Sequence, residues 1–220
     1  MVKLVVFDWN GTLLADFQAV LEGVEQELKV LGLPPMTAAA YRQHYDTPLV
    51  NFYKSIGVSA EEFEAKHMAI AKAFHAYYEP RVAKAHTRQG ARKTLQFLKK
   101  QGIACVIVSN HTMEGIYFQL ERLKLTDYFD AVLANEGIGL NHYEGKQARV
   151  HHYLRDNNFL PSQTAIIGDT IEEVRIGRNL GLKTVALTGG YNSITRLRKA
   201  EPDVLIHKLP DIVNVIKEEA

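Results

Sequence analysis

The sequence predicts an α/β protein in which helices cover both faces of a parallel β-sheet. Short apolar segments rich in β-branched residues recur along the chain, and segments with the spacing of amphipathic helices separate most of them. Strands that alternate with helices are typical of β-α-β units, which build parallel sheets. The predicted strands are Val2–Phe7, Ile103–Val108, Ala131–Ala134, Thr164–Ile167, Lys183–Leu187 and Val204–Ile206.

Helices are expected between most of these strands. In Gln89–Gln101, the residues Ala91, Leu95 and Leu98 share one face while lysines and arginines occupy the other. Gly181 stands where a glycine would end a helix before the next strand. The other helices predicted in this part of the chain are Met113–Leu123, Lys146–Asp156 and Ile171–Leu180.

One long region, from about Ala15 to Ala85, contains no convincing strand. Ser59 and Glu62 have the spacing of a capping box, and Pro80 is expected to end the last helix of the region. The sequence therefore predicts a core of residues 1–14 and 86–220 and an inserted helical cap of residues 15–85, beside the Asp8 end of the sheet. The helices predicted in the cap are Phe17–Leu31, Thr37–His44, Leu49–Ile56 and Ala60–Tyr78.

Composition excludes several classes of protein. The 220 residues are 46% hydrophobic and 23% charged, which is ordinary for a globular protein. A net charge of +1 gives no electrostatic reason to expect nucleic acid or an anionic membrane as a partner. No apolar segment approaches the roughly 18 residues of a membrane span, and the N-terminus lacks a signal-peptide pattern. The single Cys105 is expected to be a buried, inert thiol, so a reducing, cytoplasmic location fits best.

Polar residues follow the predicted strands at four places. Asp8 ends the first strand and begins the turn Asp-Trp-Asn-Gly-Thr, which reaches Thr12. Ser109 and Asn110 follow the second strand, and Lys146 opens a helix after the glycine-containing loop 136–145. The fourth place, residues 168–173, reads Gly-Asp-Thr-Ile-Glu-Glu. Each group alone could be a turn, a helix cap or a surface charge, but ligands of open α/β sheets bind at the carboxyl ends of the strands.

Together these residues have the chemistry of a phosphoryl-transfer site. Asp8 and Asp169 are hard oxygen ligands of the kind that suits Mg²⁺. Ser109, the amide of Asn110 and Lys146 would supply donors to phosphoryl oxygens. With the negative charge of the phosphate offset in this way, Asp8 could attack phosphorus and form an aspartyl-phosphate.

In these motifs the chain resembles the haloacid dehalogenase-like (HAD) hydrolase superfamily, and the resemblance covers its whole length. The helical insertion after the first strand is similar to that of phosphoglycolate phosphatase-like members. The family's four motifs are an Asp-x-Asp-Gly-Thr turn, a Ser or Thr after a strand, a Lys, and Gly-Asp followed by an acid. They are met here, in order, by residues 8–12, Ser109, Lys146, and Gly168, Asp169 and Glu173.

The resemblance implies a Rossmann-like core and a role for each motif residue. Asp8 would be the nucleophile, and Mg²⁺ would be held by Asp8, the backbone carbonyl of Asn10 and Asp169. Glu173 would orient a metal-bound water or a group that contacts a metal ligand. The substrate's leaving group should face the cap. The residues expected to be catalytic are Asp8, Asn10, Thr12, Ser109 and Lys146, and those expected to bind substrate are Ser109, Asn110, Lys146, Arg42 and Tyr45.

Asn10 departs from the family's pattern. In phosphatases of the family an aspartate here is the general acid and base, and an amide cannot exchange a proton near pH 7. General acid–base catalysis contributes about 10²–10⁴-fold, so its loss would slow hydrolysis without necessarily abolishing it. Four explanations stay open: an engineered Asp→Asn change, a natural enzyme with slow turnover or a good leaving group, deamidation of Asn10 to aspartate, or binding without turnover.

The function predicted from the sequence is a Mg²⁺-dependent phosphatase of a small phosphorylated metabolite. The substrate would be a phosphoglycolate-like phosphomonoester or an acyl phosphate, hydrolysed through an aspartyl-phosphate on Asp8. The alternative is a catalytically weakened protein of the same fold that binds a phosphorylated ligand or has a regulatory role. Residue 10 is the feature on which the choice between them depends.

Overall fold

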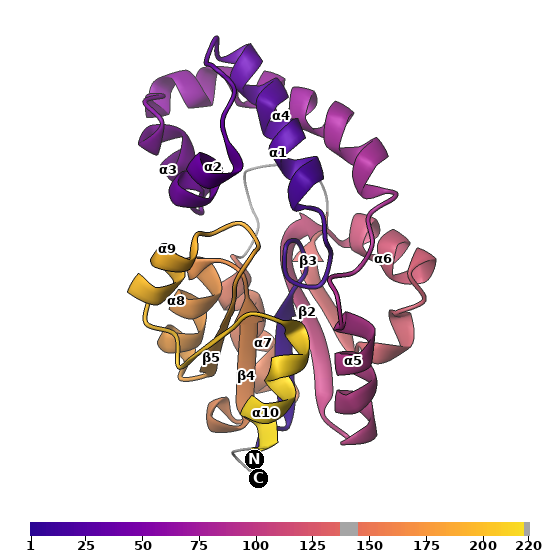
Figure 1. Cartoon of the computed structure of the whole chain (residues 1–220). Coiled ribbons are helices and arrows are strands. Elements are labelled where there is room, and N and C mark those ends of the chain that lie inside the picture. The colour runs from indigo at the N-terminus through magenta and orange to yellow at the C-terminus, as the bar shows by residue number, and fades with distance from the viewer. Residues whose placement is uncertain (137–144, 218–220) are drawn as a thin grey trace.

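A parallel sheet forms the centre of the computed structural model, which describes residues 1–136 and 145–217 (Figure 1). Most of the predicted loop 136–145 lies outside the described residues. The strand order is β3-β2-β1-β4-β5-β6, and every neighbouring pair is parallel. The strands are β1 (Leu4–Asp8), β2 (Ala104–Thr112), β3 (Ala131–Asn135), β4 (Thr164–Gly168), β5 (Lys183–Leu187) and β6 (Val204–Ile206).

Strand β1 lies in the middle of the sheet and is buried along its whole length. It pairs with β2 on one side, where Asp8 lies opposite Val108, and with β4 on the other, where Phe7 lies opposite Ile167. The strand order reverses at β1, and such a reversal opens a crevice at the carboxyl ends of the strands. The fold thus brings Asp8 to the place where a ligand is expected.

Helices cover both faces of the sheet, because the side chains of β1 alternate between two apolar clusters. Val5 and Phe7 belong to one cluster, and Leu4 and Val6 belong to the other. The first face is covered by α5 (Ala91–Lys100), α6 (Met113–Arg122) and α10 (Ile212–Lys217). The second is covered by α7 (Lys146–Asp156) and α8 (Ile171–Leu180), with α9 (Ile194–Lys199) beside α8. The predicted α/β fold is confirmed.

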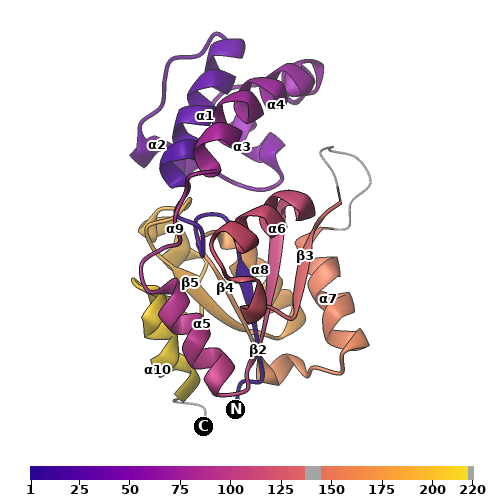
Figure 2. The same cartoon turned by 90° about the vertical axis from the view of Figure 1, so that its right-hand side faces the viewer.

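Four further helices lie together above the carboxyl edge of the sheet (Figures 1 and 2). In α1, Gly23 lets the ring of Phe74 on α4 approach the backbone closely, so the two helices pack as a pair. The division of the chain at residues 14/15 and 85/86 into core and cap stays a prediction. The four helices are α1 (Phe17–Val30), α2 (Ala38–His44), α3 (Leu49–Ser55) and α4 (Ala60–Val82).

Local signals were read correctly in two places and wrongly in one. Gly181 has a left-handed conformation, with φ 70°, and ends α8 as predicted. Ser59 accepts a hydrogen bond from the backbone N–H of Glu62 at 3.1 Å, so the predicted N-cap is present. The prediction that Pro80 ends α4 was wrong, because the helix continues to Val82 with Pro80 inside it. A proline so near the C-terminal end removes one backbone donor, and the last turn closes through Glu79, whose carbonyl accepts from Ala83.

No helix among the described residues combines the length and apolar character that crossing a membrane requires. Cys105 is buried in the sheet, and burial raises the pKa of its thiol to about 12. A thiol with this pKa stays protonated near neutral pH, which agrees with the inert side chain expected from the sequence.

Candidate active site

A buried lysine links two carboxylates at the tip of β1. The Lys146 Nζ donates to Asp8 Oδ1 at 2.7 Å and to Glu173 Oε1 at 2.6 Å. Glu172 lies further out, 3.5 Å from the same nitrogen. Lys146 is the first residue of α7 and is 5% exposed. Its ammonium group therefore makes hydrogen bonds to these carboxylates in place of the water molecules that solvate a surface lysine. Asp8 and Lys146, 138 residues apart, are thus in direct contact.

The electrostatics of this chain favour a charged lysine and oppose a charged Asp8. Burial alone would lower the pKa of Lys146, but Asp8 and Glu173 outweigh it, so the pKa is raised well above its usual value. Burial raises the pKa of Asp8, Lys146 opposes this, and Glu173 and Asp169 raise the pKa further. The charge of Lys146 therefore offsets only part of the cost of burying Asp8 beside two further carboxyl groups. The second Asp8 oxygen, Oδ2, makes no hydrogen bond to another described residue.

Asp169 is held rigidly beside this group. The Thr12 hydroxyl donates to its Oδ1 at 2.5 Å, and the backbone N–H of Tyr191 donates to its Oδ2 at 2.6 Å. Burial raises the pKa of Asp169 to about 6. A Cβ atom added at Gly11 would lie 2.4 Å from Asp169 Oδ2, and one added at Gly190 would lie 2.0 Å from the same oxygen. Both distances are too short for a non-bonded contact, so glycine is required at both positions. Gly11 also has φ +75°, which other residues rarely adopt.

The NH₂ group of the Asn10 amide faces Asp16, and its carbonyl oxygen faces Ser109. Its Nδ2 donates to Asp16 Oδ2 at 2.7 Å and to the Tyr78 hydroxyl at 2.9 Å. Its Oδ1 lies 3.4 Å from the Ser109 hydroxyl, which donates to it. Burial and the Asp16 charge raise the pKa of Tyr78, so the phenol stays protonated and can donate. Asn10 is therefore part of a network that joins β1, α1 and α4.

Ser109 and Asn110 lie inside β2, which continues to Thr112 and does not end at Val108 as predicted. The pairing of β2 with β3 changes register after Val108. Ser109 is 1% exposed, and its hydroxyl accepts from the backbone N–H of His111 at 3.1 Å. Asn110 is exposed, and its Nδ2 donates to Glu172 Oε2 at 3.1 Å. Glu173 uses both of its oxygens, one for Lys146 and the other for the Thr170 hydroxyl at 2.6 Å. Glu173 thus contacts Lys146 directly, and its role in orienting a metal-bound water stays a prediction.

Two residues of the helical insertion approach the same centre. Arg42 of α2 donates from Nε to the carbonyl of Gly190 at 2.7 Å, and its guanidinium lies 3.9 Å from the centre of the Phe17 ring. The Tyr45 ring stacks on Tyr41, with 5.2 Å between ring centroids. Burial raises the pKa of Tyr45, and the charge of Glu172 raises it further, so its hydroxyl stands within electrostatic reach of the site. Substrate binding by Arg42 and Tyr45 stays a prediction.

The residues at the tip of β1 suit a divalent cation of the Mg²⁺ type. Asp8, Asp169 and Glu173 are all buried carboxyl groups. Lys146 donates hydrogen bonds to Asp8 and Glu173, so one positive charge faces three acidic groups and negative charge is in excess. A hard cation with oxygen ligands would offset that excess. Among the described residues no three His, Cys, Asp or Glu side chains form a complete metal cage. Mg²⁺ does not need one, because it keeps several waters and takes one or two carboxylates.

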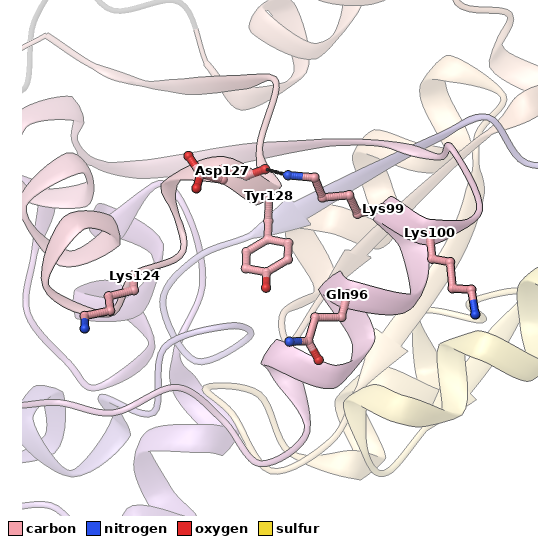
Figure 3. Close-up of a pocket in the computed structure, with 6 residues that line it drawn as sticks. All are labelled: Gln96, Lys99, Lys100, Lys124, Asp127 and Tyr128. Atoms are coloured by element: carbon pink, nitrogen blue, oxygen red, sulfur yellow. Dashed lines mark hydrogen bonds between the residues drawn. The ribbon is translucent and has the colours of Figure 1, made fainter.

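Two hollows in the described surface differ in their relation to these residues. A small one of about 50 Å³ lies next to Asn10 and is lined also by Glu79 and His111. A larger one of about 400 Å³ lies away from the carboxyl ends of the strands, beside α5. Figure 3 shows that its lysines, Lys99, Lys100 and Lys124, do not point toward one another, and the Lys99 Nζ donates to the carbonyl of Asp127. The larger hollow therefore lacks convergent groups for a ligand.

Sequence reasoning missed three residues around the site. Asp16 is 1% exposed and accepts hydrogen bonds from Asn10, Gly11, Tyr78 and Tyr191. Tyr191 donates its hydroxyl to Asp16 at 2.8 Å. Arg88 donates to the carbonyls of Gly11 at 2.7 Å and Thr188 at 2.8 Å. An acid six residues after Asn10 in the same turn was the available signal for Asp16.

The sheet order, the carboxylate at the tip of β1 and the buried lysine beside it are those of an α/β enzyme. A family model described as haloacid dehalogenase-like hydrolase matches residues 5–187, so the chain belongs to that family. Among its relatives, a phosphoglycolate phosphatase of Nitrosococcus oceani is 27% identical over 222 residues, which cover 99% of this chain and 98% of that protein. A phosphoglycolate phosphatase of Vibrio vulnificus is 22% identical and covers 98% of this chain and 96% of its own length.

Solved structures agree with the fold over nearly the whole chain. A predicted phosphatase from Clostridium acetobutylicum superposes with a TM-score of 0.81 at 19% identity and covers 99% of both chains. A haloacid dehalogenase-like hydrolase from Streptococcus pneumoniae gives a TM-score of 0.80 at 20% identity, covering 97% of this chain and 98% of its own. The helical insertion above the sheet is thus included in the likeness.

Proposed function

We propose that this protein is a Mg²⁺-dependent phosphatase that hydrolyses a small phosphorylated metabolite through an aspartyl-phosphate on Asp8. The observation that carries the proposal is the contact between Asp8 and Lys146 at the end of the central strand. Lys146 engages one oxygen of Asp8, and the other is free of hydrogen bonds to described residues. The named phosphoglycolate phosphatase relatives and the family match support the same reaction class.

In the proposed reaction Asp8 Oδ2 forms a bond to phosphorus while the bond between phosphorus and the leaving oxygen breaks. Lys146 stabilises the phosphoryl oxygens and keeps Asp8 in its rotamer, and Glu173 keeps the lysine in reach. The Ser109 hydroxyl, which now donates to Asn10 Oδ1, would turn to donate to a phosphoryl oxygen, and the backbone N–H of Asn110 would donate to another. Water then attacks the phosphorus of the aspartyl-phosphate, which releases inorganic phosphate and regenerates Asp8.

The proposed cation would be held by Asp8, Asp169 and the backbone carbonyl of Asn10. Its charge would draw the phosphate toward Asp8 and favour the ionised carboxylate. Thr12 and the backbone N–H of Tyr191 keep Asp169 oriented for this purpose. This assignment rests on the excess of buried negative charge and on the family of the chain.

Asn10 limits the substrates that this site can hydrolyse quickly. Its amide cannot protonate a leaving alkoxide, although its Oδ1 can accept a hydrogen bond from the attacking water. Substrates whose leaving group needs no proton, such as acyl phosphates, should therefore be favoured over simple phosphomonoesters. Phosphoglycolate-like phosphomonoesters would be slower substrates, and we expect the reaction to take place in the cytoplasm.

The proposal is tested by phosphate release from a panel of phosphomonoesters and acyl phosphates with and without Mg²⁺. Asp8→Asn keeps the shape of the side chain and should abolish turnover, because an amide is not a nucleophile toward phosphorus. Asp156→Asn, at an exposed aspartate of α7, is the matched control and should behave as the wild type. Equal hydrolysis by Asp8→Asn and the wild type would overturn the role of Asp8.

The position of Asn10 favours a second candidate, a protein that binds a phosphorylated ligand without turning it over. The same panel distinguishes the two, with calorimetric titration of each compound as a second readout. Stoichiometric binding with no phosphate release by the wild type would support this alternative and exclude the phosphatase.

A further inference from the structure

We propose that Asp16 is the positioning residue of this active site, and that its carboxylate is the reason why position 10 carries an amide. The inference rests on the proposed function for its catalytic part, and on the geometry of the network for its structural part. Asp16 would fix the Asn10 side chain so that its carbonyl oxygen, and not its NH₂ group, faces Ser109 and the reacting phosphoryl group.

Asp16 is a buried carboxylate bonded to groups from three separate parts of the chain. Its Oδ1 accepts from the backbone N–H of Gly11 at 2.8 Å. Its Oδ2 accepts from Asn10 Nδ2 at 2.7 Å, from the Tyr78 hydroxyl at 2.7 Å and from the Tyr191 hydroxyl at 2.8 Å. Asp16 is 1% exposed, so these four neutral donors take the place of water around the charge.

Hydrogen-bond chemistry fixes which end of the Asn10 amide meets Asp16. An ionised carboxylate only accepts hydrogen bonds, so the NH₂ group of the amide must face it. The second hydrogen of that group points to the Tyr78 hydroxyl, 2.9 Å away. The carbonyl oxygen is consequently turned to the opposite side, where the Ser109 hydroxyl donates to it at 3.4 Å. Asn10 thus presents an acceptor toward the active site.

An aspartate at position 10 is incompatible with Asp16 in this arrangement. Asn10→Asp would put a carboxylate oxygen where Nδ2 now lies, 2.7 Å from Asp16 Oδ2, with no hydrogen between the two oxygens. The donor to the Tyr78 hydroxyl would be lost as well. Two carboxylates in contact repel strongly in a buried site. The introduced side chain must then turn away or take up a proton, and either change weakens the contact that Asn10 makes between β1 and α4.

Exchanging the two residues should restore the network. In the double variant Asn10→Asp/Asp16→Asn, the amide introduced at position 16 keeps an oxygen for the Gly11 N–H and offers its NH₂ group to the carboxylate at position 10. The Tyr78 hydroxyl can donate to that carboxylate in place of accepting from Asn10. The Tyr191 hydroxyl now donates to Asp16 Oδ2, and in the double variant it would accept the second hydrogen of the introduced amide. Asp16→Asn alone leaves two amides side by side, so one of the present donors loses its acceptor.

A double-mutant cycle of Asn10→Asp and Asp16→Asn tests this inference by thermal unfolding and by phosphate release. Each single variant should unfold about 5 °C or more below the wild type, since each leaves a buried polar group badly paired. The double variant should regain most of that loss. Asn51→Asp, at an exposed asparagine of α3, is the matched control and should unfold at the wild-type temperature.

In the activity part of the cycle, kcat should fall on the order of tenfold to a hundredfold in each single variant, with a smaller change in KM. The double variant should recover kcat to at least the wild-type value. If Asn10→Asp alone keeps the unfolding temperature and hydrolyses as fast as the wild type, Asp16 does not require an amide at position 10. Recovery of stability without recovery of kcat would overturn the positioning role.

The unfolding data keep this inference separate from the proposed function. If the wild type hydrolyses nothing on the panel, the phosphatase proposal fails, whereas the coupling between positions 10 and 16 is still measured by thermal unfolding. Additive losses in the two single variants and the double variant would overturn the pairing itself, whatever the activity.

Discussion

At the scale of single residues, the site is built from charges that would be unfavourable if any partner were missing. Lys146 is buried between Asp8 and Glu173, and Asp169 is held by Thr12 and a backbone N–H. Burying such charges costs several kcal/mol each unless hydrogen bonds and opposite charges replace water. Each contact in the group therefore contributes both to folding and to the orientation of Asp8.

The close approach of Gly190 to Asp169 gives a sharp test of this packing. Gly190→Ala would place a methyl group 2.0 Å from Asp169 Oδ2, so the carboxylate must move away from the Tyr191 N–H. We expect hydrolysis to fall on the order of 10²-fold, since small displacements of reacting groups have effects of that size. The rate of phosphate release by Gly190→Ala and by the wild type measures this fall in hydrolysis.

The control for that experiment is Gly145→Ala. Gly145 has φ −60°, and no atom of the described residues lies within 4 Å of the Cβ atom that alanine would add, so this variant should hydrolyse as the wild type. Equal activity of Gly190→Ala and Gly145→Ala would mean that the position of Asp169 does not matter for the reaction.

Sequence position alone identified the residues that meet at the tip of β1, but not the residues that orient them. Asp8 ends β1, Ser109 lies near the end of β2, and Asp169 follows β4. Parallel strands bring such positions to one edge of the sheet. Asp16, Arg88 and Tyr191 lie in loops, and their contacts cross 5 to 175 residues of sequence. The acid in the same turn as Asn10 was a local signal for Asp16, but no local pattern indicates the contacts of Arg88 and Tyr191, which could be found only in three dimensions.

At the scale of helices and strands, predictions were most accurate where periodicity was strong. The helices at residues 146–156 and 171–180 and the strand at residues 183–187 have the predicted bounds. The six-residue helices α9 and α10 were not predicted, because so few residues show little periodicity. The error at Pro80 shows that proline is tolerated in the last turn before a helix ends.

A buried carboxyl group in α1 makes the stability of the helical insertion depend on pH. Glu27 is 7% exposed, and burial raises its pKa to about 8, although its hydrogen bond to Tyr53 opposes the rise. Glu27 therefore keeps its proton in the folded protein at pH values above its ordinary pKa, where the same side chain in the unfolded chain has released the proton. The stabilisation is complete at low pH and is lost as pH rises through 8.

We expect Glu27 to lower the free energy of unfolding by about 1.4 kcal/mol per pH unit between pH 5 and 8. Glu27→Gln cannot ionise and should remove that slope. Urea unfolding at several pH values measures it, with the exposed Glu64→Gln as the control. Identical slopes for Glu27→Gln and the wild type would show that Glu27 is charged in the folded protein.

At the scale of the whole molecule, the proposed cation would join parts of the core that are far apart in the sequence. Asp8 ends β1 and Asp169 follows β4, so a ligand bound to both should stabilise the folded chain. When the Mg²⁺ concentration is about 100 times its dissociation constant, the free energy of unfolding should rise by about 2.7 kcal/mol. This corresponds to an increase of roughly 5–10 °C in the unfolding temperature.

Thermal unfolding with Mg²⁺ and with a chelator tests this expectation. Asp169→Asn removes one ligand charge and should lose most of the Mg²⁺-dependent shift. If Mg²⁺ raises the unfolding temperature of Asp169→Asn as much as that of the wild type, the cation binds elsewhere on the molecule.

The contact between Asn10 and Asp16 also constrains how this protein can change over evolutionary time. A single nucleotide change at either codon can convert one side chain into the other type, but the intermediate carries two acids or two amides in one buried space. The two positions should consequently behave as one epistatic unit, and substitutions at them should appear in pairs across descendants of this chain. Engineering that restores an acid at position 10 has to begin at position 16.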